Sequence, residues 1–546
     1  MDQTTRPRAA TTSPERTEPP LPDPVRSVYE AVDVRPLLRW LLERAGDMGL
    51  TFESHSPTDS RESYCDTPDW RLHRAGYTLR ICAGPDHVLG ILGRIAGSGE
   101  EPNLPVTEAF GSVDPGSFRS GSGLVAEALT ALLGARPVVR HVEFRRQGES
   151  YHLRSGERVL ATLSLVNVFV PLEGSDDPVR LSRFEVRTAD DPFDPVLTQL
   201  LEAAQRACGL RPVQVSVFDS ALLASGITPT KSPDLGSEII EPGRPVGDVA
   251  LAVLRTHFRR MLAHEPGTRL GDDIEDLHAM RVSGRRLRAA FSLYRKVLPA
   301  RGKTLLADLR WLGRALGEVR DLDVQLAWLR GWREEVAPDE AVALGVIEEI
   351  LLGRRRDARR RLLKVLDSRR YDRFVERSGS FLRHGPVRRS PVARLAITTV
   401  APELISGRYR SVQKARRHIT PASPPEPYHR LRILVKRLRY ACEFHRDVYG
   451  KKVDRVVSAV TNLQDLLGEH QDACVAMEWL AELVERERRR FSTSHAFALG
   501  KLAERLQGRA EQLRAKFPNK SKQLGGRRWK RLRRAMDAAN RDGPGR

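Results

Sequence analysis

The side chains with the clearest potential for chemistry are a histidine and several arginines that recur at helical spacing. They are His278, Arg281, Arg285 and Arg288. On a helix these four side chains share one face, within a sector of roughly 80°. The opposite face is apolar and consists of Met280, Leu287, Phe291 and Tyr294. Guanidinium groups bind anions through charge-assisted hydrogen bonds, so the pattern predicts a helix that buries one face and offers the other to an anion.

The same pattern returns 151 residues later. His429, Arg432, Lys436, Arg437 and Arg439 follow in the order of His278, Arg281, Arg285, Arg286 and Arg288. The correspondence continues without a gap, and Leu316, Gly317, Glu318, Asp321 and Trp328 match Leu467, Gly468, Glu469, Asp472 and Trp479. A constant offset over about fifty residues predicts an internal duplication that brings two basic helices into one fold.

The segments that must position these residues have the apolar spacing of helices. This spacing extends from residue 248 to residue 536, and we expect two repeats at about 248–390 and 391–536. Two further basic segments lie in the second repeat, Lys414 to Ile419 with Lys414, Arg416 and Arg417, and Gly525 to Met536. Each segment either extends the anion-binding surface or is an ordinary solvated helix face.

Other polar residues of the repeats admit more than one role. Glu318, Asp321, Glu469 and Asp472 have the spacing of a metal site, but we interpret them as intramolecular partners that orient arginines. His278 and His429 are interpreted as structural or phosphate-contacting residues, because no carboxylate cluster accompanies them that would indicate a metal site. A nearby anion would favour the protonated imidazole. Trp328 and Trp479 are predicted core residues.

The N-terminal half has a different character. Residues 1–24 are rich in Pro and Thr and are predicted to be disordered. Residues 25–227 predict an α+β domain, with helices at 36–46 and 195–208 and strands at 78–82, 140–147, 151–155, 159–170 and 180–188. Antiparallel strands with few helices favour a sheet curled into a barrel. Residues 228–247 are rich in Pro, Gly and Ser and are a predicted linker.

Charge is divided unequally between the two halves. Residues 1–247 hold 26 Lys+Arg and 34 Asp+Glu, whereas the remainder holds 65 and 36, so the net charges are −8 and +29. This distribution predicts a polyanionic partner for the C-terminal half. The five cysteines form no C-x-x-C pair, which argues against a disulfide framework or a zinc finger and suits a reducing cytoplasm. No apolar run approaches the roughly 20 residues that cross a bilayer, so we expect a cytoplasmic protein with no membrane partner.

The paired motifs resemble the CHAD domain. The first, H-x-x-R-V-x-x-R-R-L-R, begins at His278, and the second, H-x-x-R-x-x-x-K-R-L-R-Y, begins at His429; each is followed by L-G-E-x-x-D. The resemblance covers about residues 247–536 and implies an all-α helical bundle with internal duplication. It also implies binding of inorganic polyphosphate in a basic channel between the two halves. The residues it assigns to that site are His278, Arg281, Arg285, Arg286, Arg288, His429, Arg432, Lys436, Arg437 and Arg439.

The segment from Tyr64 to Cys82 is similar to the Y-x-D-T block of the CYTH domain, the triphosphate tunnel fold. The resemblance implies an antiparallel β-barrel, and in active members of the family a magnesium-dependent reaction on triphosphate. Magnesium and triphosphate require several converging carboxylates. Only Asp33 and Glu185 can be placed as weak metal candidates, so we expect a degenerate domain with no catalytic residue and no cofactor, magnesium being needed only if the domain is active.

The combined expectation is a CYTH-like domain followed by a CHAD-like domain that binds polyphosphate, with targeting to polyphosphate granules as a suggested role. Three alternatives remain: a metal-dependent triphosphatase in the N-terminal domain, nucleic-acid binding by the same basic helices, or binding of an acidic protein partner. The helices lack an evident base-reading set, so nucleic acid is the less favoured partner. Chain-length preference and oligomeric state are not determined by these patterns.

Overall fold

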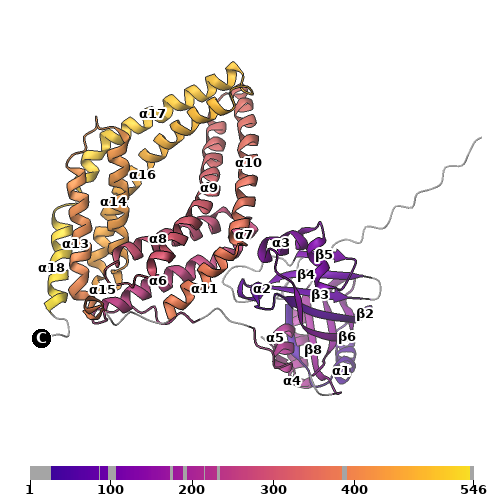
Figure 1. Cartoon of the computed structure of the whole chain (residues 1–546). Coiled ribbons are helices and arrows are strands. Elements are labelled where there is room, and N and C mark those ends of the chain that lie inside the picture. Colours follow the sequence, from indigo (N-terminus) through magenta and orange to yellow (C-terminus); the bar gives the residue numbers. More distant parts are fainter. Residues whose placement is uncertain are drawn as a thin grey trace, which may run out of the picture. The chain divides into compact units, whose positions relative to one another are not determined.

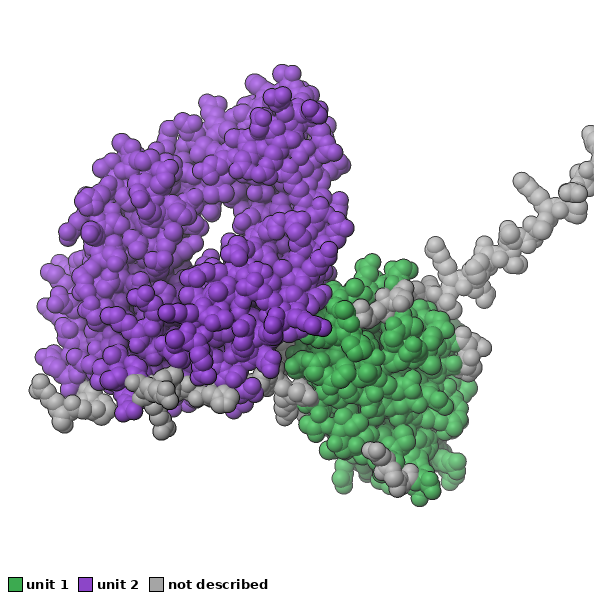
Figure 2. Space-filling view, viewed as in Figure 1, with its two compact units in different colours: residues 1–231 green, residues 232–546 purple. Residues whose placement is uncertain are grey.

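The chain forms two compact units, residues 1–231 and 232–546 (Figures 1 and 2). The computed structural model describes residues 26–84, 87–95, 106–172, 176–188, 194–213, 216–229, 234–383 and 390–541. The segment 1–24, predicted to be disordered, lies outside the described residues. Within the predicted linker 228–247, the described residues form loop and turn until helix α6 begins at Val246.

The first unit is built on one nine-stranded antiparallel sheet with the order β5-β4-β3-β2-β6-β7-β8-β1-β9. Its strands are β1 (Arg26–Glu30), β2 (Thr51–Asp66), β3 (Tyr77–Ala83), β4 (Val88–Arg94), β5 (Val106–Phe110), β6 (Val139–Ser155), β7 (Arg158–Val170), β8 (Val179–Thr188) and β9 (Arg211–Pro212). Its helices are α1 (Val34–Asp47), α2 (Arg71–Arg74), η1 (Pro115–Ser120), α3 (Leu124–Leu133), α4 (Pro195–Cys208) and α5 (Val217–Ala224). Among the described residues β5 and β9 are the two edges and do not pair with each other.

Two apolar clusters hold helices against this sheet. In one, Leu41 of α1 and Leu200 of α4 pack with Phe184 of β8. In the other, Phe218 of α5 packs with Trp70, which precedes α2. The predicted helix at 195–208 coincides with α4, and Asp194 caps its first turn by accepting hydrogen bonds from the next amides. The predicted strands at 140–147 and 151–155 prove to be one long strand, β6, because its pairing with β7 continues through Gly148.

The second unit is all helical. Its helices are α6 (Val246–Ala263), α7 (Glu265–Leu270), α8 (Ile274–Leu293), α9 (Gly302–Glu335), α10 (Pro338–Leu366), α11 (Arg369–Arg383), α12 (Pro391–Arg394), α13 (Ile397–Arg416), α14 (Pro425–Glu443), α15 (Arg446–Tyr449), α16 (Lys451–Arg486), α17 (Thr493–Lys522) and α18 (Arg527–Arg541). The fold class predicted from the sequence, an antiparallel β domain followed by an all-α domain with internal duplication, is confirmed.

The two repeats meet through equivalent backbone segments. Helices α6 and α13 begin 151 residues apart, as do α8 and α14. Just before α6 and α13, Pro245 forms an antiparallel bridge with Ala396, the residue 151 positions later. The Val246 amide donates to the Leu395 carbonyl at 2.8 Å, and the Ile397 amide donates to the Arg244 carbonyl at 2.9 Å. These reciprocal bonds indicate that the repeats are related by a local two-fold arrangement.

The apolar face predicted for residues 273–297 is the buried face of α8. Met280, Leu287, Phe291 and Tyr294 all belong to one large core shared by the two repeats. A smaller core joins α9, α10, α16 and α17 and contains Trp479. Trp328 is only half-buried and stacks on Trp332, so its assignment to the core was wrong while that of Trp479 is confirmed. Figure 2, in which all side chains are drawn, shows an opening in this unit.

Candidate functional site

The main cavity of the helical unit lies between α8, α9, α13 and α14. It has a volume of about 710 Å³. Eight of its lining residues are cationic, and among the described residues that line it none is Asp or Glu. The eight are Arg285, Arg288, Arg295, Lys303, Arg310, Arg408, Lys436 and Arg437. We call this the shared cavity, because both repeats contribute to it.

Equivalent residues of the two repeats face each other across the shared cavity. Arg285 of α8 and Lys436 of α14 occupy matching positions, 151 residues apart, and both line it. Helix α8 starts at the N-cap Asp273, whose side chain accepts from the Glu275 amide at 2.8 Å. Helix α14 starts at Pro425, a residue suited to the first helical turn. Arg285 and Arg288 of the first predicted basic face and Lys436 and Arg437 of the second therefore line one cavity, whereas Arg281 and Arg432 do not line it.

Cations outnumber carboxylates in this region. Burial lowers the pKa of Arg281, Arg288 and Arg432, and neighbouring arginines lower it further, whereas Asp321 and Asp472 oppose this effect at Arg281 and Arg432. The pKa of Lys436 falls to about 7, first because of burial and then because of Arg432 and Arg285. An anion placed among these side chains would favour their charged forms, so the site suits an anionic ligand.

Two buried donors in this region also lack an acceptor. Arg285 Nε and Arg432 Nε have no hydrogen-bond partner within the described part of the chain. A buried N–H group without an acceptor costs about 1–3 kcal/mol. Oxygen-rich anions supply several acceptors at once, so these donors fit the same class of ligand as the positive charge does.

Arg281 and Arg432 contact acidic residues in the way that the sequence predicted. The distance from Arg281 Nη2 to Asp321 Oδ1 is 3.6 Å, and that from Arg432 Nη2 to Asp472 Oδ1 is 3.8 Å. Both carboxylates are more than half exposed, and both ion pairs are long. The other two acidic residues of the motif, Glu318 and Glu469, pair with Arg361 and Arg509 of the neighbouring helices α10 and α17. All four acidic residues therefore orient arginines, as predicted.

Two of the predicted site residues have a structural role instead. Arg286 Nη2 lies 3.0 Å from Glu443 Oε2, and Arg439 Nε lies 3.0 Å from Glu443 Oε1. Both guanidiniums also lie over the ring of Tyr440. Arg286 and Arg439 thus share one carboxylate, and neither of them lines the shared cavity. Ser292 occupies the matching position in the first repeat and carries no charge, so the equivalent Arg288 remains in the cavity.

The two histidines lie in different surroundings. His278 is half-buried and its pKa is lowered, mainly by burial and then by Arg320, so its imidazole is neutral at pH 7 in the absence of an anion. His429 is exposed, and its Nδ1 lies 2.7 Å from Gln471 Oε1. Neither lines the shared cavity. Within the described residues no group of three or more His, Cys, Asp or Glu side chains has the arrangement of a metal site.

The additional basic residues at the end of α13 are also outside the shared cavity. Arg416 is tied to the protein, since its Nη1 donates to the Ser521 carbonyl at 3.0 Å and its Nε to Gln413 Oε1 at 2.7 Å. Lys414 and Arg417 are exposed. Arg416 is therefore a structural residue, which was not expected.

Sequence analysis missed half of the cations that line the cavity. They are Arg295, Lys303, Arg310 and Arg408. Arg295 follows α8, Lys303 and Arg310 lie in the first turns of α9, and Arg408 comes from α13 of the other repeat. None belongs to the repeated motif, and only the packing of the helices brings these four residues to the cavity.

The weak metal candidates of the sheet unit do not converge. Asp33 is an exposed N-cap of α1 that accepts from the Arg35 amide and pairs with Arg180 at 3.3 Å. Glu185 is buried in β8 and pairs with Arg146 at 2.7 Å. The first strand is β1, which ends at Glu30, so Asp33 lies beyond that strand.

Charges inside this sheet neutralise one another. Glu62 of β2 lies 3.4 Å from Arg80 and 3.9 Å from Arg146, which also holds Glu185. Arg183 donates to Ser220 Oγ at 2.8 Å. Glu62 and Glu185 thus each have a guanidinium where a divalent cation would have to bind. The described residues of this unit do not fit a magnesium site.

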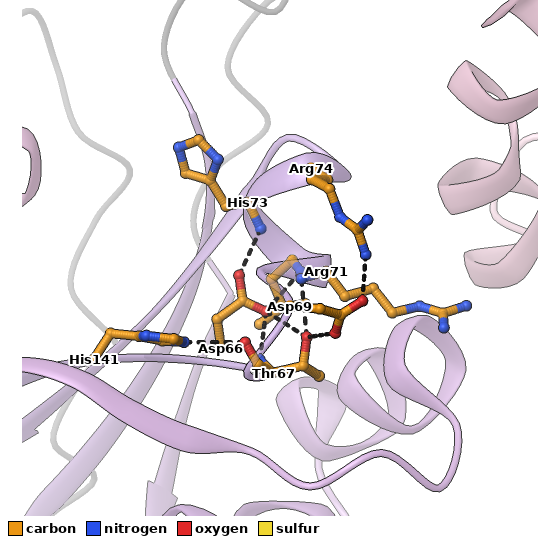
Figure 3. Close-up of polar contacts among 8 residues, drawn as sticks. Asp66, Thr67, Asp69, Arg71, His73, Arg74 and His141 are labelled. Atoms are coloured by element: carbon orange, nitrogen blue, oxygen red, sulfur yellow. Dashed lines mark hydrogen bonds and ion pairs between the residues drawn. The ribbon is translucent and has the colours of Figure 1, made fainter. Parts of the chain in front are cut away.

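The Asp-Thr pair of the Tyr64 to Cys82 segment builds a turn (Figure 3). Asp66 accepts hydrogen bonds from the amides of Thr67, Leu72 and His73 at 2.6–2.8 Å. Thr67 Oγ1 donates to Asp69 and accepts from the Arg71 amide. The segment that carried the sequence resemblance therefore caps and shapes the short helix α2.

Comparison with known proteins assigns the helical unit. Its architecture defines a class: a duplicated helical domain whose two halves line one basic cavity. Residues 252–481 match the CHAD domain family, so the C-terminal part of the chain contains a CHAD domain. The crystal structure of the CHAD domain from the plant Ricinus communis is 26% identical and covers 53% of this chain and 96% of that chain, with a TM-score of 0.45.

Further matches concern three other proteins. Uncharacterized proteins from two strains of Mycobacterium tuberculosis are 27% identical over 254 residues, which is 44% of this chain. The match spans 46% of the length of these relatives. A protein from Hippeastrum, described as a putative adenylyl cyclase with a dominant triphosphatase activity, is 14% identical and covers 37% of this chain and 96% of that chain, with a TM-score of 0.28. Among the described residues, no helix has both the length and the apolar character required to cross a bilayer.

Proposed function

We propose that the CHAD domain binds inorganic polyphosphate in the shared cavity. The observation that carries this proposal is the lining of the cavity, eight Arg and Lys side chains without a carboxylate among the described residues. A linear polymer with about one negative charge per phosphate matches such a lining. Localisation on polyphosphate granules follows as the corresponding cellular role.

The chemistry of the lining favours phosphate over other anions. Arg288, Arg310, Arg408 and Arg437 present planar guanidinium groups that can each donate two parallel hydrogen bonds to phosphate oxygens. Cations arrive from four helices of both repeats, so an extended polymer gains contacts that a single small anion does not. The unpartnered Nε donors of Arg285 and Arg432 add two further hydrogen bonds if phosphate oxygens or relayed waters reach them.

A titration of polyphosphate tests the proposal. The test variant is Arg288→Gln/Lys436→Gln, which removes one cation from each repeat. Hydrogen bonds to charged groups contribute about 1.5–3 kcal/mol each, so the affinity of the variant should fall by about two orders of magnitude. Isothermal titration calorimetry on the full chain measures this change.

A matched control removes two cations that lie outside the cavity. Lys414→Gln/Arg417→Gln has the same net charge as the test variant, and its side chains are exposed at the end of α13. We expect its affinity to stay within about threefold of the wild type, since exposed and distant charges are screened. Equal losses in both variants would contradict a specific role for the cavity, and absence of binding by the wild type would refute the proposal.

A further inference from the structure

Helix α18 presents a second set of cations that the shared cavity does not include. Six exposed side chains follow closely on one another and are called the α18 face: Arg527, Arg528, Lys530, Arg531, Arg533 and Arg534. None of the six has a side-chain hydrogen bond or ion pair with any described residue. Like charges at i, i+3 and i, i+4 destabilise a helix, so this face carries an uncompensated cost.

The helix holds this face rigidly against the rest of the domain. Leu532, Ala535 and Met536 are buried on its other side. Trp529 stacks on Tyr409 of α13, with ring centroids 3.7 Å apart and planes 5° apart. The cations therefore project from a fixed surface.

Comparison of the two repeats shows that the missing compensation is specific to α18. In the first repeat, α11 packs on α9, and its Arg370 and Arg377 pair with Asp308 of α9 at 3.0 and 2.8 Å. In the second repeat, α18 packs on α16. The residue of α16 that matches Asp308 is Ala459, 151 positions later, which is buried and uncharged. The second repeat thus lacks the carboxylate that neutralises the outer helix of the first.

The α18 face also lies close to the shared cavity. Arg408 of α13 lines the cavity, whereas its neighbour Tyr409 contacts Trp529 at the start of α18. Helix α13, about 10 Å thick, therefore lies between the cavity and α18, and the six cations lie on the outer side of α18. The eight cations of the cavity neutralise about eight phosphates, so a longer chain leaves the cavity with most of its charge uncompensated.

We propose that the α18 face binds the part of a long polyphosphate chain that emerges from the shared cavity, and that the domain therefore prefers long chains. This inference rests on the function proposed above for the cavity. The contacts outside the cavity are exposed and involve charges only, so they add affinity for chains long enough to reach α18 without selecting an end or a shape. Short chains that fit within the cavity gain nothing from α18.

The test compares two chain lengths on the full-length protein. The probes are polyphosphate of about eight units, matched to the cavity cations, and polyphosphate of several hundred units. The α18 variant carries Arg527→Gln, Arg528→Gln, Lys530→Gln, Arg531→Gln, Arg533→Gln and Arg534→Gln. Its affinity for the long probe should fall at least tenfold, and its affinity for the short probe should change less than about twofold.

A control with the same net charge removes six exposed cations elsewhere: Arg356→Gln, Lys364→Gln, Arg369→Gln, Arg373→Gln, Arg488→Gln and Arg489→Gln. It should keep the preference for the long probe. A second variant that changes the five arginines of the α18 face to lysine retains the charge and should bind both probes within about twofold of the wild type. If the glutamine substitutions destabilise the fold, circular dichroism will show a lower melting temperature and the affinity for the short probe will fall as well.

Each outcome separates this inference from the function on which it rests. If the glutamine variant and the control bind the long probe equally while the short probe still binds, the inference is overturned and the cavity proposal stands. If the wild type binds neither probe, the cavity proposal fails first. If the glutamine variant loses binding to duplex DNA but keeps long polyphosphate, the α18 face belongs to nucleic acid and the inference is also overturned.

Discussion

Lys436 is the residue whose charge depends most on what occupies the shared cavity. It is surrounded by Arg432 of its own helix and by Arg281 and Arg285 of α8, with Asp472 of α16 as the opposing charge. Burial and these cations lower its pKa to about 7 in the anion-free protein. A bound polyanion reverses the effect of the neighbours and raises this pKa, so binding takes up a proton.

Polyphosphate affinity should therefore decrease as the pH rises through 7. Below pH 7 Lys436 is already protonated and no proton is needed, whereas above pH 7 each binding event must first protonate it. Between pH 6.5 and 8.5 we expect affinity to fall roughly ten- to thirtyfold. Calorimetry in buffers of different ionisation enthalpy measures the accompanying proton uptake. Lys436→Arg should bind with little dependence on pH, and an unchanged pH profile in that variant would contradict the assignment.

Asp321 and Asp472 compete with the ligand for two of the arginines. Their ion pairs with Arg281 and Arg432 are 3.6 and 3.8 Å long and partly exposed, so they stabilise the fold only slightly. Asp321→Asn/Asp472→Asn should raise polyphosphate affinity about three- to tenfold, because phosphate no longer displaces a carboxylate. Binding assays on this variant and on Glu318→Gln/Glu469→Gln provide the comparison. The second variant removes the same charge from pairs with α10 and α17, and an equal gain there would indicate a general charge effect only.

At the scale of elements, α8 and α14 are joined by a buried hydrogen bond between equivalent positions. Tyr294, just after α8, lies 3.2 Å from His445 Nε2, and the two residues are 151 positions apart. His445 Nδ1 lies 2.7 Å from the Ala441 carbonyl and must be its protonated nitrogen, so Nε2 accepts from the tyrosine hydroxyl. Burial lowers the pKa of His445 to about 4, which keeps the ring neutral at pH 7.

This bond makes the stability of the helical domain sensitive to acid. The unfolded chain binds a proton on His445 at pH values near 6.5, whereas the folded chain resists it until about pH 4. Stability is therefore fully present above pH 6.5 and declines by on the order of 3 kcal/mol as the pH falls to 4. Urea unfolding of the wild type and His445→Gln measures this decline. The variant has no titrating group here and should lose distinctly less stability over the same range; identical curves would assign the decline to other groups.

In the sheet unit, the pairing of strands determines which side chains meet. Strand β2 has an irregular polar sequence without strict alternation, yet it forms a long ladder with β6. Its Glu62 and the Glu185 of β8 meet Arg146 from β6, and this buried network replaces the converging carboxylates that a metal requires. The two edges of the sheet remain distinct because β5 and β9 are not paired among the described residues.

At the scale of the whole molecule, charge is divided unequally between the N-terminal and C-terminal parts of the chain. The net charge is −8 for residues 1–247 and +29 for the remainder. Within the helical unit many arginines are used in structural ion pairs, such as Arg355 with Asp323 and Arg370 with Asp308. The shared cavity and α18 each hold a group of cations that such ion pairs do not occupy.

Binding of short polyphosphate should depend steeply on salt. Eight cavity cations release about as many counterions from the polymer. By analogy with single-stranded nucleic acid, the logarithm of the affinity should fall with the logarithm of salt concentration with a slope of about −6. Fluorescence competition between 50 and 200 mM salt, on the order of the range used for nucleic acids, measures it. A slope near zero would mean that the cavity cations do not contact the polymer.

The sequence by itself determined the duplication, the helical character of the C-terminal half, and the two basic faces on α8 and α14. These depend on periodicity within one element and on a constant spacing of 151 residues, both of which are local properties of the chain. The same constant spacing led to the prediction that Asp321 and Asp472 orient arginines. Helix α4 was also placed correctly, since Asp194 and the apolar spacing that follows it are contiguous signals.

Only the tertiary structure decided which cations are available to a ligand. Arg286 and Arg439 belong to the same motifs as Arg288 and Arg437, but both contact Glu443. Whether an arginine of the motif meets this carboxylate or the cavity depends on how the helices pack. Arg310 and Arg408 reach the cavity only because α9 and α13 pack there. Asp33 proved to be a helix cap because β1 ends before it. The free energy of a charge depends on the groups around it in space, and those neighbours come from distant parts of the chain.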